Sequence, residues 1–147
     1  MRNRPLFPKP VWMLLGLYFL ASLAHFAHNA EFIAFYPNMP HWLTREKVYL
    51  AWLAVSSVGV AAVLLGRLGW PVLGTVLLAG YGALGLDGLG HYTLALCAEH
   101  TLATNFTTWF EVASGVALLL ASSILVTRRI GGHGRRGQSP RSCRLMR

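Results

Sequence analysis

The chain has 147 residues, of which 54% are hydrophobic and only 12% charged, and its net charge is +8. Soluble domains carry roughly twice that charged fraction, so the composition excludes an ordinary water-soluble fold and a disordered chain. The two cysteines are too few for a secreted module held together by disulfides. We therefore predict an integral membrane protein.

Four apolar stretches predict an all-α fold, an integral membrane four-helix bundle with short loops. The spans are expected at approximately residues 11–35, 48–66, 70–96 and 103–127, within one domain of residues 1–130. Each stretch is long enough to cross a ~30 Å hydrocarbon core as a helix of ~20 residues. Helices are expected because backbone groups cannot stay unpaired in lipid. Four short-looped helices then form a small bundle.

Residues between the stretches predict where the helices begin and end. Pro37 and Pro40 break the chain after the first span, and Thr44 can cap the second helix. Pro71 is suited to the first turn of the third helix. The start of the chain also has the layout of a secretory signal, with a cleavage site ending at Ala24. Because apolar residues continue through Phe35, we expect the first span to be retained.

The third stretch is rich in glycine, which lets helices approach closely in a membrane. We expect such contacts along it, and not a nucleotide-binding loop, from Gly80, Gly82, Gly85, Gly88 and Gly90.

The last segment, 131–147, is rich in Gly, Ser and Arg, and we predict a disordered cytoplasmic tail. Basic residues also occur in the leader and at Arg67, so the positive-inside rule places both termini in the cytoplasm of a plasma (inner) membrane. The expected partners are the lipid bilayer and, at the tail, anionic headgroups. Nucleic acid is not expected. Homo-oligomers and a larger membrane complex stay open.

Ionisable residues gather in the predicted extracytoplasmic half, whereas the inner half is apolar. All five acids and five of the six histidines fall there or in the outer loops. At 1.5 Å per residue from the cytoplasmic ends, His25, Asp87 and Glu111 lie ~21, ~26 and ~24 Å deep. Three helices thus place polar groups in one slab, and ionisable groups inside membranes are usually functional.

This slab predicts a metal site. The predicted ligands are His25, His28, Asp87, His91 and Glu111. Asn29 is not expected to bind the metal itself but to hydrogen-bond a ligating histidine and so orient it. The spacings i,i+3 and i,i+4 put pairs of these ligands on one helix face. No Lys or Arg lies in the slab, so a cation would neutralise the two acids. This donor set favours zinc first and iron next.

Several functions fit such a site. A metal could activate water or oxygen beside a membrane-borne substrate, as in a hydrolase or oxidoreductase, with Asp87 or Glu111 as a catalytic base. Whether the protein is an enzyme is left open. The alternatives are haem b held by His91 with His25 or His28, proton or ion handling, and an accessory subunit. His41, Glu99 and His100 lie in loops, where a solvated surface role is expected.

Overall fold

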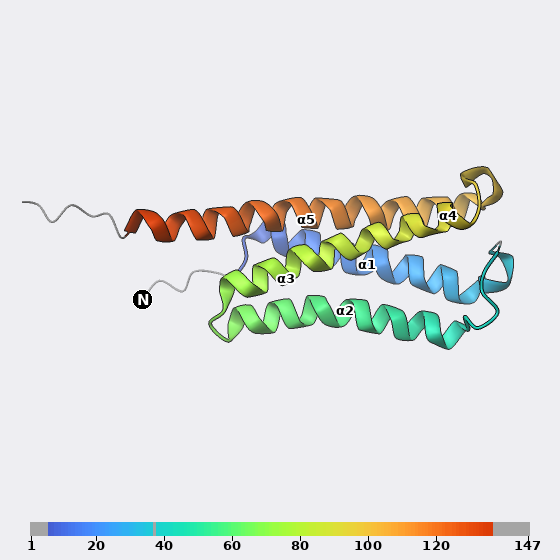
Figure 1. The fold of residues 1–147 in the computed structure, drawn as a ribbon, viewed down its shortest axis with the longest axis horizontal. Coiled ribbons are helices and arrows are strands. Elements are labelled where there is room, and N and C mark those ends of the chain that lie inside the picture. The colour runs from blue at the N-terminus through green and yellow to red at the C-terminus, as the bar shows by residue number, and fades with distance from the viewer. Residues whose placement is uncertain (1–5, 37, 137–147) are drawn as a thin grey trace, which may run out of the picture.

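The computed structural model describes residues 6–36 and 38–136, which form a bundle of long helices (Figure 1). The first two rods are α1 (Lys9–Glu31) and α2 (Arg45–Arg67). The third consists of α3 (Pro71–Leu84), the 3-10 helix η2 (Gly85–Gly90) and α4 (His91–Leu94), and the fourth is α5 (Leu102–Arg136). The described residues contain no strand. Four segments are long and apolar enough to cross a membrane, and the predicted fold class is confirmed.

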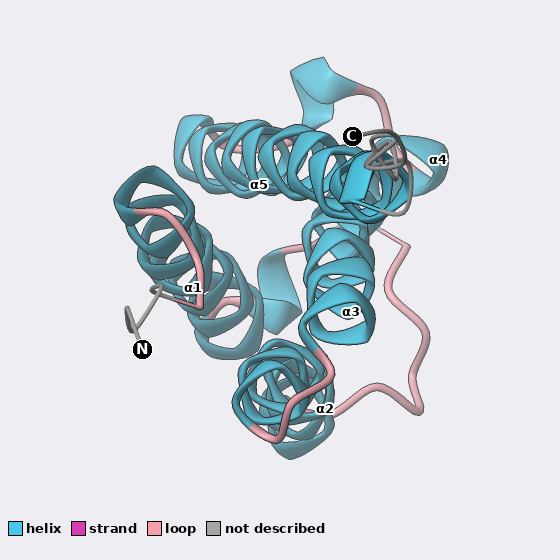
Figure 2. Ribbon diagram, turned by 90° about the vertical axis from the view of Figure 1, so that its left-hand side faces the viewer, coloured by secondary structure: helices cyan, strands magenta, loops and turns pink. Residues whose placement is uncertain are grey.

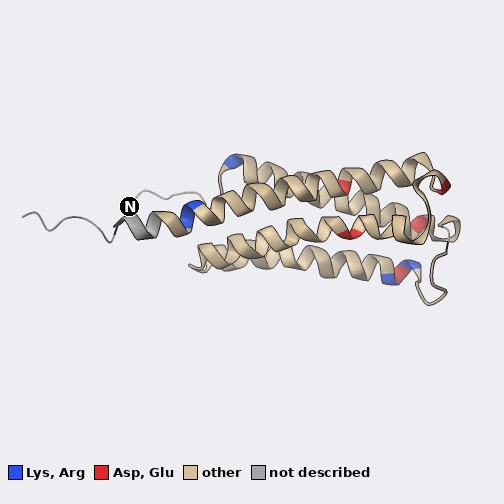
Figure 3. Cartoon of the chain, turned by 45° about the horizontal axis from the view of Figure 1, so that its top comes forward, with Lys and Arg blue, Asp and Glu red and all other residues tan. Residues whose placement is uncertain are grey.

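The four rods form a square in cross-section (Figure 2). The rod α1 packs against α2 and α5, and α3 packs against the same two helices from the opposite corner. We call the end of the bundle with the loops 32–44 and 95–101 the polar end, and the opposite end, with the 68–70 turn, the termini end (Figure 1). Figure 3 shows that the acidic residues lie in the half nearer the polar end.

The ends of the helices follow local chemistry. The Lys47 backbone N–H donates to Thr44 Oγ1 at 3.4 Å, so the predicted cap of α2 is confirmed. The helix α1 ends at Glu31, four residues before the predicted end of the first span, because the chain turns into the 3-10 helix η1 (Ile33–Phe35). Hydropathy alone does not separate a helix from a tight turn inside one apolar run.

Two predicted elements differ in the structure. The third span is not one continuous α-helix, since η2 interrupts it over Gly85–Gly90. In addition, α5 runs six residues into the segment predicted as a disordered tail, and residues 137–147 of that tail lie outside the described residues. The Arg129 guanidinium donates to the carbonyl oxygens of Pro71 and Leu6 and so ties this part of α5 to the bundle.

Close packing holds α3 against α5 along much of its length. A Cβ atom on Gly82 would lie only 2.7 Å from the backbone N of Leu119 and 2.8 Å from the carbonyl O of Gly115. At the centre of the square, the Tyr18 and Tyr81 rings meet edge to face with centroids 4.7 Å apart. The expected helix contacts are thus found at Gly82, Gly85 and Gly88, whereas a Cβ on Gly80 or Gly90 would meet no atom of the described chain within 4 Å.

Candidate functional site

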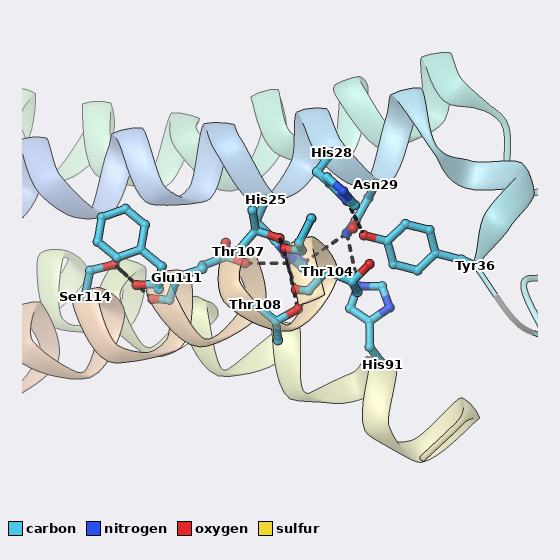
Figure 4. A network of polar contacts seen from close by, with 12 residues as sticks. His25, His28, Asn29, Tyr36, His91, Thr104, Thr107, Thr108, Glu111 and Ser114 are labelled. Carbon is cyan, nitrogen blue, oxygen red and sulfur yellow. Dashed lines mark hydrogen bonds and ion pairs between the residues drawn. The ribbon is translucent and has the colours of Figure 1, made fainter. Parts of the chain in front are cut away.

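A carboxyl and an imidazole meet inside the bundle near the polar end (Figure 4). His25 on α1 lies with its Nε2 3.5 Å from Glu111 Oε2 on α5, and each residue is only 2% exposed. Among the described residues, Glu111 Oε2 has no hydrogen-bond partner. An unpaired buried carboxylate costs several kcal/mol, so this carboxyl group is either protonated or neutralised by a neighbour.

The Asn29 amide connects this pair to a second histidine. Asn29 Nδ2 donates to His25 Nε2 and to His91 Nε2, each at 3.0 Å (Figure 4). The other nitrogen of the His25 ring, Nδ1, lies 3.5 Å from Thr108 Oγ1. In this orientation of the amide, the bonds suit neutral imidazoles that carry their proton on Nδ1 and accept at Nε2.

The network borders a cavity of about 180 Å³ beneath the 32–44 loop. Its polar wall consists of His25, Asn29, Asp87, His91 and Glu111. The opposite wall is apolar and includes Ile33, Met39, Leu43, Val48 and Ala51. Among the described residues, no Lys or Arg lines it. The cavity therefore offers hydrogen-bonding groups at one side and a hydrocarbon surface at the other, without a fixed positive charge.

Asp87 lines this cavity with His91, but it is more exposed than the other predicted ligands. In η2, with about three residues per turn, positions four apart are rotated by roughly 120° and no longer share a face. His91 is half-buried in the network, whereas Asp87 is exposed although it also lines the cavity. The buried slab thus holds one carboxyl group, Glu111, and not two.

His28 lies outside this network. Its Nδ1 is hydrogen-bonded to the Tyr36 hydroxyl at 2.7 Å, and its ring is tilted against Phe32. It lines a separate cavity with Tyr36 and Thr104. Burial raises the pKa of the Tyr36 phenol, which favours the protonated hydroxyl. Of the five predicted ligands, the structure places His25, His91, Glu111 and Asp87 around one cavity and His28 around another.

The three ionisable loop residues, His41, Glu99 and His100, differ in their exposure. His41 and Glu99 are exposed, in agreement with the surface role expected for them. His100 is half-buried, and its Nε2 lies 3.3 Å from the His91 carbonyl oxygen. It therefore packs over the network, although it offers no ring nitrogen to the cavity wall.

Sequence reasoning missed Thr104, Thr108 and Tyr36. The threonines belong to a buried stripe of α5 with the helical spacing of four and three residues, Thr104, Thr108, Glu111, Gly115, Leu118 and Ser122. That stripe of small and polar residues could have been found from the sequence as the face on which Glu111 lies. Tyr36 could not, because the turn at η1 that brings it back over His28 has no periodic signal.

The donor atoms are not arranged around an ion. Within residues 6–36 and 38–136, no group of three His, Cys, Asp or Glu side chains lies close enough to hold a metal. The metal site, its zinc or iron, and haem b stay predictions. For haem b, the Asn29 amide lies between His25 and His91, and this contact does not involve the alternative pair of His28 with His91.

Comparisons with known proteins give no match. No family model fits the chain, and neither a curated protein nor a solved structure is significantly similar to it. Any functional conclusion has to come from the site.

Proposed function

We propose that this small four-helix membrane protein takes up and releases a proton at the buried pair formed by Glu111 and His25. The observation that carries the proposal is their contact of 3.5 Å at 2% exposure, beside a cavity without Lys or Arg. A carboxyl group in such a place is more stable when it is neutral. The resting pair then has a protonated Glu111 facing the unprotonated Nε2 of His25.

Asn29 suits both proton states of this site. In the present orientation its N–H groups serve two unprotonated Nε2 atoms. After a half-turn of the amide, Oδ1 would face the rings and accept from a protonated Nε2. Within the described chain, Asn29 Oδ1 has no hydrogen-bond partner, so the half-turn gives up no bond of that atom. It exchanges the bond to His25 and gives up the bond that Nδ2 donates to His91.

The cavity provides a place for a molecule that could exchange a proton with the Glu111–His25 pair. A membrane-borne molecule with a polar group could bind between the apolar wall and the polar wall, where His25 and Glu111 act toward it as general acid and base. General acids and bases work best when their pKa lies near the pH at which the protein operates. The site would then be enzymatic or proton-handling according to the bound molecule.

Infrared spectroscopy of the reconstituted full chain tests the proposal. We expect a protonated-carboxyl band at neutral pH that disappears in Glu111→Gln and titrates at a different pH in His25→Gln. The control is Glu46→Gln, because Glu46 is exposed and its loss leaves the band in place. A spectrum without this band at neutral pH, or a band that persists in Glu111→Gln, would overturn the proposal.

A divalent metal, with zinc before iron, is the second candidate. One observation favours it: His25 Nε2 and His91 Nε2 both point at one position, which the Asn29 nitrogen occupies at 3.0 Å from each. Zinc binds imidazole at about 2.0–2.1 Å, so the rings would close by about 1 Å and the amide would swing aside. Glu111 would supply a third ligand. Against this candidate, the exposed Asp87 leaves only one buried carboxyl group to neutralise.

Elemental analysis of the purified protein separates the two candidates. If the metal candidate holds, wild type contains near-stoichiometric zinc or iron, and His91→Ala loses it. His28→Ala should keep it, since His28 bonds to Tyr36, and so should His133→Ala. A folded, metal-free wild type with the Glu111 infrared band would rule out the metal and leave the proton site standing.

A further inference from the structure

A second cavity lies between α1, α2 and α3, away from the site at the polar end. It is a groove of about 420 Å³ that runs from the middle of the bundle toward the termini end. Its walls are almost entirely apolar, and Trp12 and Phe19, each 37% exposed, lie at its edge. Gly16 forms part of the surface, and a Cβ there would meet no atom of the described chain within 4 Å.

Two buried hydroxyl groups interrupt this apolar lining at the inner wall of the groove. Tyr81 is 1% exposed and Ser56 is 8% exposed, and both residues line the groove. The two side chains interact with each other. In the described part of the chain, however, neither Tyr81 Oη nor Ser56 Oγ has a partner at hydrogen-bonding geometry. A bond between the two hydroxyls would use one O–H as its donor and leave the other O–H without an acceptor. A buried polar group without a partner is costly, and an acceptor from outside the protein would satisfy it.

The chemistry of the groove restricts that partner. Two O–H groups can donate to one acceptor, such as a carbonyl oxygen, and among the described residues Arg67 is the only charged residue in the lining. Arg67 follows Ser56 by eleven residues on α2, a rise of roughly 16 Å. An anionic phospholipid held by Arg67 would therefore place alkyl chain against the hydroxyls and leave them unpaired.

We propose that this groove binds a quinone-type lipophile, with a ring carbonyl accepting hydrogen bonds from Tyr81 and Ser56 and its tail lying along the apolar wall toward Arg67. Trp12, Phe19 and Tyr81 line the groove, and aromatic side chains pack favourably against a planar ring. The two hydroxyl groups and the apolar walls therefore favour a ligand with a neutral, carbonyl-bearing head and an apolar tail. The binding does not depend on the Glu111–His25 pair.

The test is equilibrium binding of decylubiquinone to the full chain in detergent, followed by quenching of tryptophan fluorescence. Loss of one neutral hydrogen bond weakens binding by about 2- to 10-fold, which we expect for Ser56→Ala and for Tyr81→Phe. The matched control is Ser57→Ala, because Ser57 is exposed and its Oγ donates to the Ala54 carbonyl oxygen. Its affinity should equal that of wild type.

Gly16→Leu fills the groove and provides a second, independent variant. It should abolish saturable binding, and the quenching that persists measures quinone dissolved in the micelle. Glu111→Gln should bind as wild type, which keeps this test separate from that of the proton site. Saturable binding that survives Gly16→Leu, or equal affinity in wild type, Ser56→Ala and Tyr81→Phe, would overturn the proposal, as would the absence of saturable binding. Displacement by an anionic phospholipid that Arg67→Ala abolishes would show that the groove holds that lipid instead.

Discussion

The polar network near the polar end and the hydroxyl groups in the middle of the bundle are both buried, but they differ in how their hydrogen bonds are satisfied. In the network, Asn29 bonds two histidines, and His25 lies beside Thr108 and Glu111. In the middle, the buried hydroxyls of Tyr18, Ser56 and Tyr81 have no partner at hydrogen-bonding geometry within the described chain. The network bonds its two histidines through Asn29 and leaves only Glu111 Oε2 and Asn29 Oδ1 without a partner in the described chain, whereas in the middle of the bundle we propose that a bound lipophile supplies the missing acceptor.

This difference in hydrogen bonding predicts that the network contributes to the stability of the fold and that the hydroxyls in the middle of the bundle contribute to ligand binding. A network whose members bond to one another contributes to folding, because loss of one member leaves the others unpaired. A buried hydroxyl without a partner lowers the stability of the fold until water or a ligand bonds to it. The sequence-based interpretation of the inner half as apolar missed this second region, because Tyr and Ser count among ordinary membrane-helix residues and carry no charge.

The largest expected effect on stability comes from Asn29→Leu. The change removes the donor to both His25 and His91 and should lower the free energy of unfolding by about 2–4 kcal/mol. Reversible unfolding in mixed micelles measures it, with His41→Ala as the exposed control. A loss below about 1 kcal/mol would mean that the network is not formed in the membrane.

A smaller effect is expected for His91→Ala, which removes only one of the two bonds of Asn29. We predict a loss of about 1 kcal/mol, in line with a single hydrogen bond in a membrane bundle together with some lost packing. The His28→Ala variant supplies the comparison, since it removes the bond to Tyr36 and leaves Asn29 unchanged. Hydrogen exchange of the Asn29 side chain should accelerate in His91→Ala only. Equal acceleration in both variants would place His28 in the network.

The smallest effect is expected in the middle of the bundle. Tyr18→Phe and Tyr81→Phe each remove a hydroxyl without a partner, and the free energy of unfolding should stay constant or rise by up to about 1 kcal/mol. The same unfolding assay measures both variants, in protein freed of lipid. A loss above about 1 kcal/mol would show that these hydroxyls already have a partner in the ligand-free protein.

The sequence predicted the architecture better than the site. Four apolar stretches and the cap at Thr44 define the rods, because hydropathy and capping act over short distances along the chain. The common depth of His25, Asp87 and Glu111 follows from helix rise alone. The exposure of Asp87 does not, because η2 changes the number of residues per turn in a glycine-rich stretch whose pattern also suits an α-helix. The position of Tyr36 could not be predicted either, because it depends on how the loop turns back over His28, and no sequence periodicity indicates that turn.

The protonation state of His25 tests the central claim most directly. Solid-state NMR of the ¹⁵N-histidine-labelled full chain in bilayers reports both ring nitrogens, and His25→Gln identifies the signals. At neutral pH we predict a neutral His25 with the proton on Nδ1 and an unprotonated Nε2 that faces Glu111. A His25 ring protonated at both nitrogens, beside an ionised Glu111, would contradict the neutral pair, and a metal-bound Nε2 would replace it with the second candidate.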